Sequence, residues 1–374
     1  MVSNERNTNC HNSLTRRRGW FFFSALINVS PGIVWESAAN WGFMLSAVKG
    51  SPLAAFAIAL LVALCCTPLA RSLAWRVGAL AHPGGRRQHE QPIAQWGGLA
   101  VFLAVLAAAL VWRQPQTADF RLLAASPAQT GQVAQTLHLT STFLGCGCLM
   151  LLLGMADDKW ELPPVLKFGG QLLVASLLWA LGVRITALPF TSGTQLLPDA
   201  TSYALTMLWV LGLTNGVNFI DGVDGLAAGV CAIAAGSLCL IEATKAPWAA
   251  AASAALCGAC LGFLRFNFHP AKIYLGDAGA LLLGFWLATI SLAAAAKTAA
   301  ATTLALPLLV MGIPVLDTLW AVWRRTRARQ PFWRADRGHL HHRLLARGLS
   351  PVKTVLVMYA LGLLLGGAAW LWAR

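Results

Sequence analysis

Ten apolar segments separated by polar loops fill the chain from residue 51 to residue 372. Each is about as long as an α-helix must be to cross a bilayer's hydrocarbon core of roughly 30 Å. The predicted segments are 51–73, 96–112, 139–156, 163–183, 202–217, 223–243, 247–264, 278–296, 303–323 and 352–372. Membrane-spanning β-strands would be shorter and would alternate in polarity. The pattern therefore predicts an all-α polytopic membrane protein, a bundle of about ten transmembrane helices.

The composition excludes several other classes of protein. Charged residues make up 11% of the chain, against about 25% in a typical soluble domain, so we exclude an ordinary cytosolic enzyme and a disordered chain. The net charge is +14, but the basic residues lie mostly between apolar segments, so we predict no nucleic-acid partner. Most of the nine cysteines lie in apolar stretches, where we interpret them as packing residues rather than zinc ligands or disulfides.

The chain divides into two regions. Residues 1–50 form an N-terminal extension that we expect to be disordered or partly membrane-associated, with Met44 as an alternative start. Residues 51–374 form the transmembrane domain. The sequence does not decide whether the extension belongs to the mature protein.

Five loops carry most of the chemically informative side chains. They are residues 76–98, 157–161, 215–225, 265–277 and 324–348. All five follow odd-numbered apolar segments, so they emerge on one side of the membrane. Arginines are dense on that side, and the positive-inside rule makes it cytoplasmic. We therefore predict a multi-pass protein of the inner (plasma) membrane with an active site facing the cytoplasm.

Carboxylates and an asparagine amide beside arginine, lysine and histidine suit a site for Mg²⁺ and phosphate. Zinc is the alternative metal, but His339, His341 and His342 on one short loop fit its geometry poorly. A transporter of an anionic substrate is the alternative function. Transporters place charged groups near the bilayer midplane, often in inverted repeats, whereas these acids cluster at one face.

Four of the loops carry motifs of a known superfamily. The motifs are ADDKWELPPVLKFGGQ, NGVNFIDGVDGLAAG, FNFHPAKIYLGDAGALLLGF and PFWRADRGHLHHRLL, in this order. They resemble the polyprenyl-phosphate N-acetylhexosamine-1-phosphate transferases, and DRGHLHH is similar to the GlcNAc-1-phosphate branch. The resemblance covers residues 51–372. The first loop departs from the family pattern, since His82-Pro83-Gly84 stands where an Asp-Pro-Asn start is usual.

The resemblance implies a reaction and its partners. A sugar 1-phosphate would be transferred from a UDP-sugar donor to undecaprenyl phosphate or another polyprenyl phosphate. GlcNAc-1-phosphate is the first choice for the transferred group. UMP would be released, and the step would begin cell-envelope polysaccharide synthesis, with Mg²⁺ or alternatively Mn²⁺ as cofactor. UDP-GalNAc, the downstream glycan, the prenyl length and the oligomeric state, including a homodimer, stay open.

The resemblance also gives roles to individual residues. Asn218 and Asp277 are similar to the family's metal ligands. Asp157, Asp158 and Asp221 are the predicted catalytic acids: the first two would deprotonate or orient the lipid phosphate, and Asp221 would position metal or sugar. The predicted substrate-binding residues are Lys167 for phosphate, Asp224, Asn267 and Tyr274 for uracil, and Arg337, His339, His341 and His342 for diphosphate and sugar.

One further acid lies within an apolar segment. A buried carboxylate in a membrane helix is costly and often functional, so Asp317 is a weaker candidate. Pairing with a nearby arginine such as Arg325 is an equally good interpretation.

Overall fold

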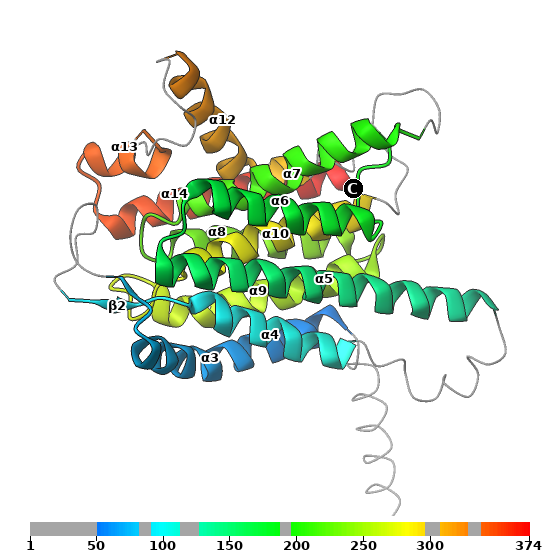
Figure 1. The fold of residues 1–374 in the computed structure, drawn as a ribbon, viewed down its shortest axis with the longest axis horizontal. Coiled ribbons are helices and arrows are strands. Elements are labelled where there is room, and N and C mark those ends of the chain that lie inside the picture. Colours follow the sequence, from blue (N-terminus) through cyan, green and yellow to red (C-terminus); the bar gives the residue numbers. More distant parts are fainter. Residues whose placement is uncertain (1–50, 82–90, 113–126, 188–195, 296–306, 328–337) are drawn as a thin grey trace, which may run out of the picture. The chain divides into compact units, whose positions relative to one another are not determined.

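A computed structural model describes residues 51–81, 91–112, 127–187, 196–295, 307–327 and 338–374. The predictions for residues 1–50 lie outside this range. The helices are α3 (Pro52–Val77), α4 (Gly97–Trp112), α5 (Pro127–Trp160), α6 (Pro164–Ala180), α7 (Asp199–Ile220), α8 (Leu226–Glu242), α9 (Pro247–Asn267), α10 (Gly276–Ala295), α12 (Gly312–Arg327), α13 (Leu340–Ala346) and α14 (Pro351–Ala373) (Figure 1). Strands β1 (Leu80–Ala81) and β2 (Ile93–Ala94) pair antiparallel.

Each of the ten predicted segments contains a helix of the structure. Within the described residues, six helices are long and apolar enough to cross a membrane: α3, α5, α7, α9, α10 and α14. Helices α4, α6 and α8 are apolar but shorter. The all-α, multi-spanning architecture is therefore confirmed, whereas the number of ten spans stays a prediction.

Three local features differ from the sequence prediction. Helix α5 begins at Pro127 rather than near residue 139, because its polar first turns are helical without being apolar. It also continues to Trp160, so Asp157 and Asp158 lie in its last turn and not in a loop. The small sheet within the first loop and helix α13 within the last loop were not expected from hydropathy.

Helix α10 lies at the centre of the packing. It contacts α4, α5, α7, α8 and α9, and nearly all of its side chains are buried. Small residues permit this close approach in a membrane bundle. A Cβ atom at Gly154 of α5 would come within 2.5 Å of the Ala278 Cα. Glycine at this position therefore brings the end of α5 against the start of α10.

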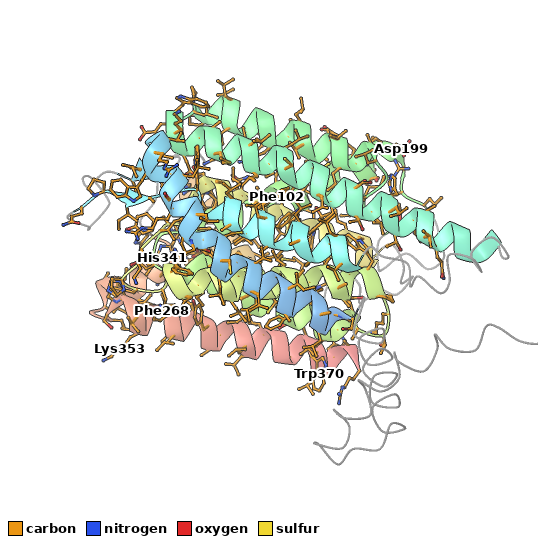
Figure 2. All side chains as sticks on the ribbon, turned by 90° about the horizontal axis from the view of Figure 1, so that it is seen from below. Phe102, Asp199, Phe268, His341, Lys353 and Trp370 are labelled. Atoms are coloured by element: carbon orange, nitrogen blue, oxygen red, sulfur yellow. The ribbon has the colours of Figure 1, made fainter. Side chains whose placement is uncertain are left out.

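The remaining helices enclose this centre. Helix α9 packs between α3 and α8, and α14 packs against α8. Figure 2 shows His341 and Phe268 at one end of the helices and Asp199 and Trp370 at the other. The end that carries His341 contains the candidate site.

Candidate functional site

The five chemically informative loops meet at one end of the helices. Ala94 of the first loop forms a parallel bridge with Ile273 of the fourth, and the Gly97 N–H donates to the Tyr274 carbonyl oxygen at 3.0 Å. The fifth loop reaches the third, where the His341 Nε2 lies 2.7 Å from the position that a Cβ on Gly222 would take. The prediction that these loops emerge on a common side is therefore confirmed.

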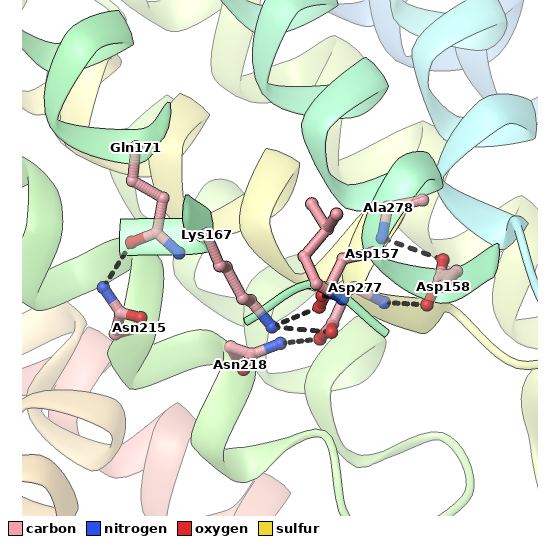
Figure 3. Close-up of polar contacts among 9 residues, drawn as sticks. Asp157, Asp158, Lys167, Gln171, Asn215, Asn218, Asp277 and Ala278 are labelled. Atoms are coloured by element: carbon pink, nitrogen blue, oxygen red, sulfur yellow. Dashed lines mark hydrogen bonds and ion pairs between the residues drawn. The ribbon is translucent and has the colours of Figure 1, made fainter. Parts of the chain in front are cut away.

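Asp277, in the first turn of α10, is the centre of a charged cluster (Figure 3). One carboxylate oxygen, Oδ2, lies 2.6 Å from the Lys167 Nζ. The other, Oδ1, accepts a hydrogen bond from the Asn218 side-chain amide. The cluster thus joins the start of α10, the start of α6 and the end of α7.

Asp157 completes an ion-pair triad around the same lysine. Its Oδ2 lies 2.7 Å from the Lys167 Nζ, and its Oδ1 accepts from the Leu162 N–H at 2.9 Å. The Asp157 side chain is 8% exposed and that of Lys167 is 19% exposed. Lys167 therefore stands between two carboxylates and keeps part of its side chain exposed.

Asp158 has different partners from Asp157. Its Oδ1 accepts from the Asp277 N–H at 2.7 Å and its Oδ2 from the Ala278 N–H at 3.1 Å. These N–H groups belong to the first turn of α10, which has no intrahelical acceptor for them. Gly276 has φ +70°, and a Cβ there would collide with the Asp158 carboxylate. Asp158 therefore caps α10 and fixes the backbone of Asp277.

A polar pair one helical turn further into the bundle supports this cluster. The Asn215 amide donates to the Gln171 Oε1 at 2.7 Å. Gln171 follows Lys167 by four residues on α6, and Asn215 precedes Asn218 by three on α7, so each lies on the same helix face as its neighbour. Their position as polar residues within apolar segments was the sequence signal that could have identified them.

Asp221 follows α7 directly and is partly buried. Desolvation, together with the negative charges of Asp277 and Asp224, raises the pKa of Asp221 to about 7. Carboxylates at this end of the molecule therefore repel one another. Such repulsion favours a bound cation or a shared proton.

The three predicted uracil residues form a connected loop network. The Asp224 Oδ2 lies 2.9 Å from the His269 Nδ1 and accepts from the Ala271 N–H at 3.0 Å. Asn267 is buried, and its amide bonds the Gly225 N–H and the Ile273 carbonyl oxygen. Both ends of the Asn267 side chain are thus engaged by backbone.

Two tyrosines connect this network to neighbouring parts of the chain. The Tyr274 N–H donates to the Ala94 carbonyl oxygen at 2.8 Å, and its side chain is partly buried. The Tyr359 hydroxyl of α14 donates to the Gly225 carbonyl oxygen at 2.6 Å. Tyr359 was missed because its segment was interpreted only as an apolar span.

The histidines of the last loop have unequal surroundings. The His339 Nδ1 lies 2.7 Å from the Asp317 Oδ2, and both side chains are buried. Asp317 also accepts from the Leu340 N–H at 2.8 Å. Asp317 therefore pairs with His339 rather than with an arginine, and the pair joins α12 to the start of α13.

His341 is fully buried, and neither ring nitrogen has a hydrogen-bond partner within the described residues. Burial, followed by the charge of His342, lowers the pKa of His341 to about 4. His342 is partly exposed, and its ring centroid lies 4.2 Å from that of His341. Of these two rings, that of His342 is the one open to a ligand. Arg337 lies outside the described residues.

The donor set suits a hard divalent cation. The side chains of Asp277 and Asn218 are in contact, and both carry the oxygen ligands that Mg²⁺ prefers. Asp221 lies close enough for burial, and then the charge of Asp277, to raise its pKa to about 7. Within the described chain, His, Cys, Asp and Glu side chains form no cluster of three that could hold a metal by themselves. A cation here would therefore need ligands from substrate or water, as is usual for Mg²⁺.

Comparison with known proteins gives a consistent family. The protein family described as "Glycosyl transferase family 4" matches this chain over residues 140–295. A Bacillus subtilis protein named "Probable undecaprenyl-phosphate N-acetylglucosaminyl 1-phosphate transferase" is 34% identical over 82% of this chain and 81% of its own length. The chain belongs to glycosyl transferase family 4. It is also 36% identical to the Mycobacterium tuberculosis "Decaprenyl-phosphate N-acetylglucosaminephosphotransferase", over 80% of this chain and 77% of that protein.

A relative with a different name matches less of the chain. The Halalkalibacterium halodurans "Phospho-N-acetylmuramoyl-pentapeptide-transferase" is 36% identical over 53% of this chain and 61% of its own length. The family 4 match over residues 140–295 includes Asp157, Lys167, Asn218 and Asp277. The cluster described above therefore lies within the part of the chain that defines the family.

Proposed function

We propose that this family 4 transferase moves GlcNAc-1-phosphate from UDP-GlcNAc to a polyprenyl phosphate, giving a polyprenyl-diphosphate sugar and UMP. The observation that carries the proposal is Lys167, held between Asp157 and Asp277 at one end of a bundle of apolar helices. A phosphate on a membrane lipid and a soluble nucleotide can meet at such a place. The names of the two bacterial relatives described above support the choice of GlcNAc.

In this reaction an oxygen of the lipid phosphate attacks the β-phosphorus of the donor. The bond between that phosphorus and the bridging oxygen breaks, and UMP leaves with the electron pair. Phosphoryl transfer depends mainly on positioning and on charge stabilisation. We propose that Lys167 binds the lipid phosphate and that Asp157 and Asp277 fix its ammonium group.

Asp157 is not required as a strong base in this scheme. A phosphate monoester has a second pKa near 6, so it is mostly ionised at neutral pH. Asp157 would therefore orient Lys167 and the phosphate rather than remove a proton. Asp158 would act by holding the first turn of α10, which carries Asp277.

Asn218 and Asp277 would hold Mg²⁺, or alternatively Mn²⁺, with Asp221 beside them. When bound, the cation would supply neutralisation of the charge that develops on the leaving UMP. The contact between Asn218 and Asp277 and the raised pKa of Asp221 support this assignment.

The residues around the Asp277 cluster would determine which donor binds. We propose that Tyr274 stacks on uracil and that Asp224 contacts the same base, while buried Asn267 keeps the loop in shape. His342 and Arg337 would contact the diphosphate and sugar. His339 and His341 would support the segment that carries His342, because both are buried.

Removing divalent cations should abolish activity. We expect no product from purified protein in EDTA and full recovery when Mg²⁺ or Mn²⁺ is added in excess. The reason is that Asp221 and Asp277 would then face the donor diphosphate with Lys167 as their nearest counter-charge and no divalent cation to neutralise the leaving group. Undiminished turnover in chelator would remove the metal from the proposal.

The function itself is tested with purified protein, polyprenyl phosphate and a panel of UDP-sugars. We expect UMP release with UDP-GlcNAc, little with UDP-GalNAc, and none when the lipid is omitted. Lys167→Met, which removes the ammonium group but keeps most of the side-chain volume, serves as the matched inactive control. UMP release that is independent of the lipid would contradict the proposal.

The cytoplasmic orientation of the site is also a proposal, supported by the arginine-rich loops. Glu161 follows α5 at the site end, and Asp199 lies at the opposite end; both are exposed. We expect an impermeant maleimide added to intact cells to label Asp199→Cys and not Glu161→Cys. The parent protein controls for labelling of its native cysteines. Labelling of Glu161→Cys from outside would mean that the site end of the protein faces away from the cytoplasm.

A further inference from the structure

A pocket of about 460 Å³ lies beside the last turns of α3. Its walls come from α3, from β2 with the residues before it, and from the loop that follows α9. None of the predicted site residues lines it. The pocket is therefore a separate feature from the Asp277 cluster.

Two cations face this pocket. Arg71 and Trp75 line it from α3, where they are four residues apart and so share one helix face, and Lys272 lines it from the opposite wall. Arg71 and Lys272 are exposed, and neither has an ion-pair partner within the described residues. Gln91 adds a polar amide. A guanidinium and an ammonium around one hollow are suited to a phosphate group.

The adjoining surface is apolar. Helix α3 is long and apolar enough to span a membrane, and the exposed side chains on the side of Arg71 include Leu53 (72%), five turns before it, and Leu61 (60%), about 80° away around the helix. Trp75 is 45% exposed at the pocket. Exposed tryptophan near the end of a spanning helix is typical of the level of the lipid headgroups. A ligand here would meet cations at one end and a lipid-facing helix along its length.

We propose that this pocket binds an anionic glycerophospholipid of the surrounding bilayer. Its phosphate lies between Arg71 and Lys272, and its acyl chains follow the exposed leucines of α3. A soluble anion would use only the cations and would leave the apolar surface without a partner. The proposal does not depend on the reaction assigned to the Asp277 cluster.

The test is native mass spectrometry of the full chain in detergent, titrated with dioleoyl phosphatidylglycerol. Each removed cation should weaken binding about fivefold, the usual worth of one basic residue near an anionic membrane surface. We therefore expect the double variant Arg71→Gln/Lys272→Gln to bind at least about tenfold more weakly. Arg76→Gln is the matched control, because Arg76 is exposed on the same helix end but does not line the pocket.

Several results would overturn the proposal. Equal losses in the Arg76→Gln control would indicate general charge attraction, and unchanged binding in the double variant would exclude the pocket. Displacement of the lipid by millimolar inorganic phosphate would indicate a site for a soluble anion. If the double variant weakened undecaprenyl phosphate binding as much as phosphatidylglycerol binding, the pocket would instead be a site for the acceptor lipid. A photoreactive phosphatidylglycerol should label wild-type protein on the peptide that contains Arg71 and Trp75; labelling only elsewhere would also contradict it.

Discussion

Asp277→Asn should lower kcat by at least about 10²-fold, the scale seen when one preorganised charge-stabilising group is lost. The substitution keeps the shape and polarity of the side chain. It removes the negative charge that pairs with Lys167 and that would hold the cation. Steady-state rates of UMP release at saturating lipid and donor measure the effect.

Tyr274→Ala is the matched comparison, because it changes binding rather than chemistry. Stacking on uracil acts equally in the ground and transition states, so its loss should mainly raise KM for the donor. The cost should be about 1–3 kcal/mol, the usual worth of base–aromatic stacking. If Tyr274→Ala lost kcat at unchanged KM while Asp277→Asn stayed near wild type, the chemistry would lie elsewhere.

Asp158→Ala should also lose about 10²-fold in kcat, because small displacements of a catalytic group have effects of that size. The alanine leaves the Asp277 and Ala278 N–H groups without their acceptor. Loss of such a cap should also cost about 0.5–2 kcal/mol of stability. Rates are measured as for Asp277→Asn, and stability by thermal unfolding in detergent.

Asp158→Asn separates a capping role from an acid–base role. Asparagine offers one acceptor oxygen where the carboxylate offers two, so it keeps one of the two hydrogen bonds to α10, and it cannot act as a base. We expect this variant to lose less stability than Asp158→Ala and to retain activity within about tenfold of wild type. A loss of activity as deep as that of Asp158→Ala, with a smaller loss of stability, would make Asp158 the general base instead.

Much of the architecture could be predicted from two features of the sequence. These are the length of each apolar segment and the alternation of successive loops between the two sides of the membrane. Every apolar segment contains a helix, and the five loops meet as alternation requires. The first turns of α5 are polar, and α13 is only seven residues long with two histidines and an arginine among its leucines, so hydropathy gave no sign of either. The strands β1 and β2 are two residues each, too short for any periodicity.

The residues of the site could be predicted from the sequence, but the contacts between them could not. Asp157 and Asp158 are adjacent in sequence and looked equivalent, yet one pairs with Lys167 and the other caps α10. That difference follows from helix geometry, since neighbouring residues on a helix point about 100° apart. The Asp317–His339 pair could not be foreseen either, because 22 residues separate its members.

Sugar-1-phosphate transfer is tested most directly with a doubly labelled donor, UDP-GlcNAc carrying ³²P at the β-phosphate and ³H in the sugar. The wild-type protein is incubated with polyprenyl phosphate, and the lipid product is extracted and counted. We expect both labels in the lipid in equal amounts, with unlabelled UMP as the soluble product. Tritium in the lipid without ³²P would mean transfer of the sugar alone with release of UDP, and it would contradict the proposed reaction.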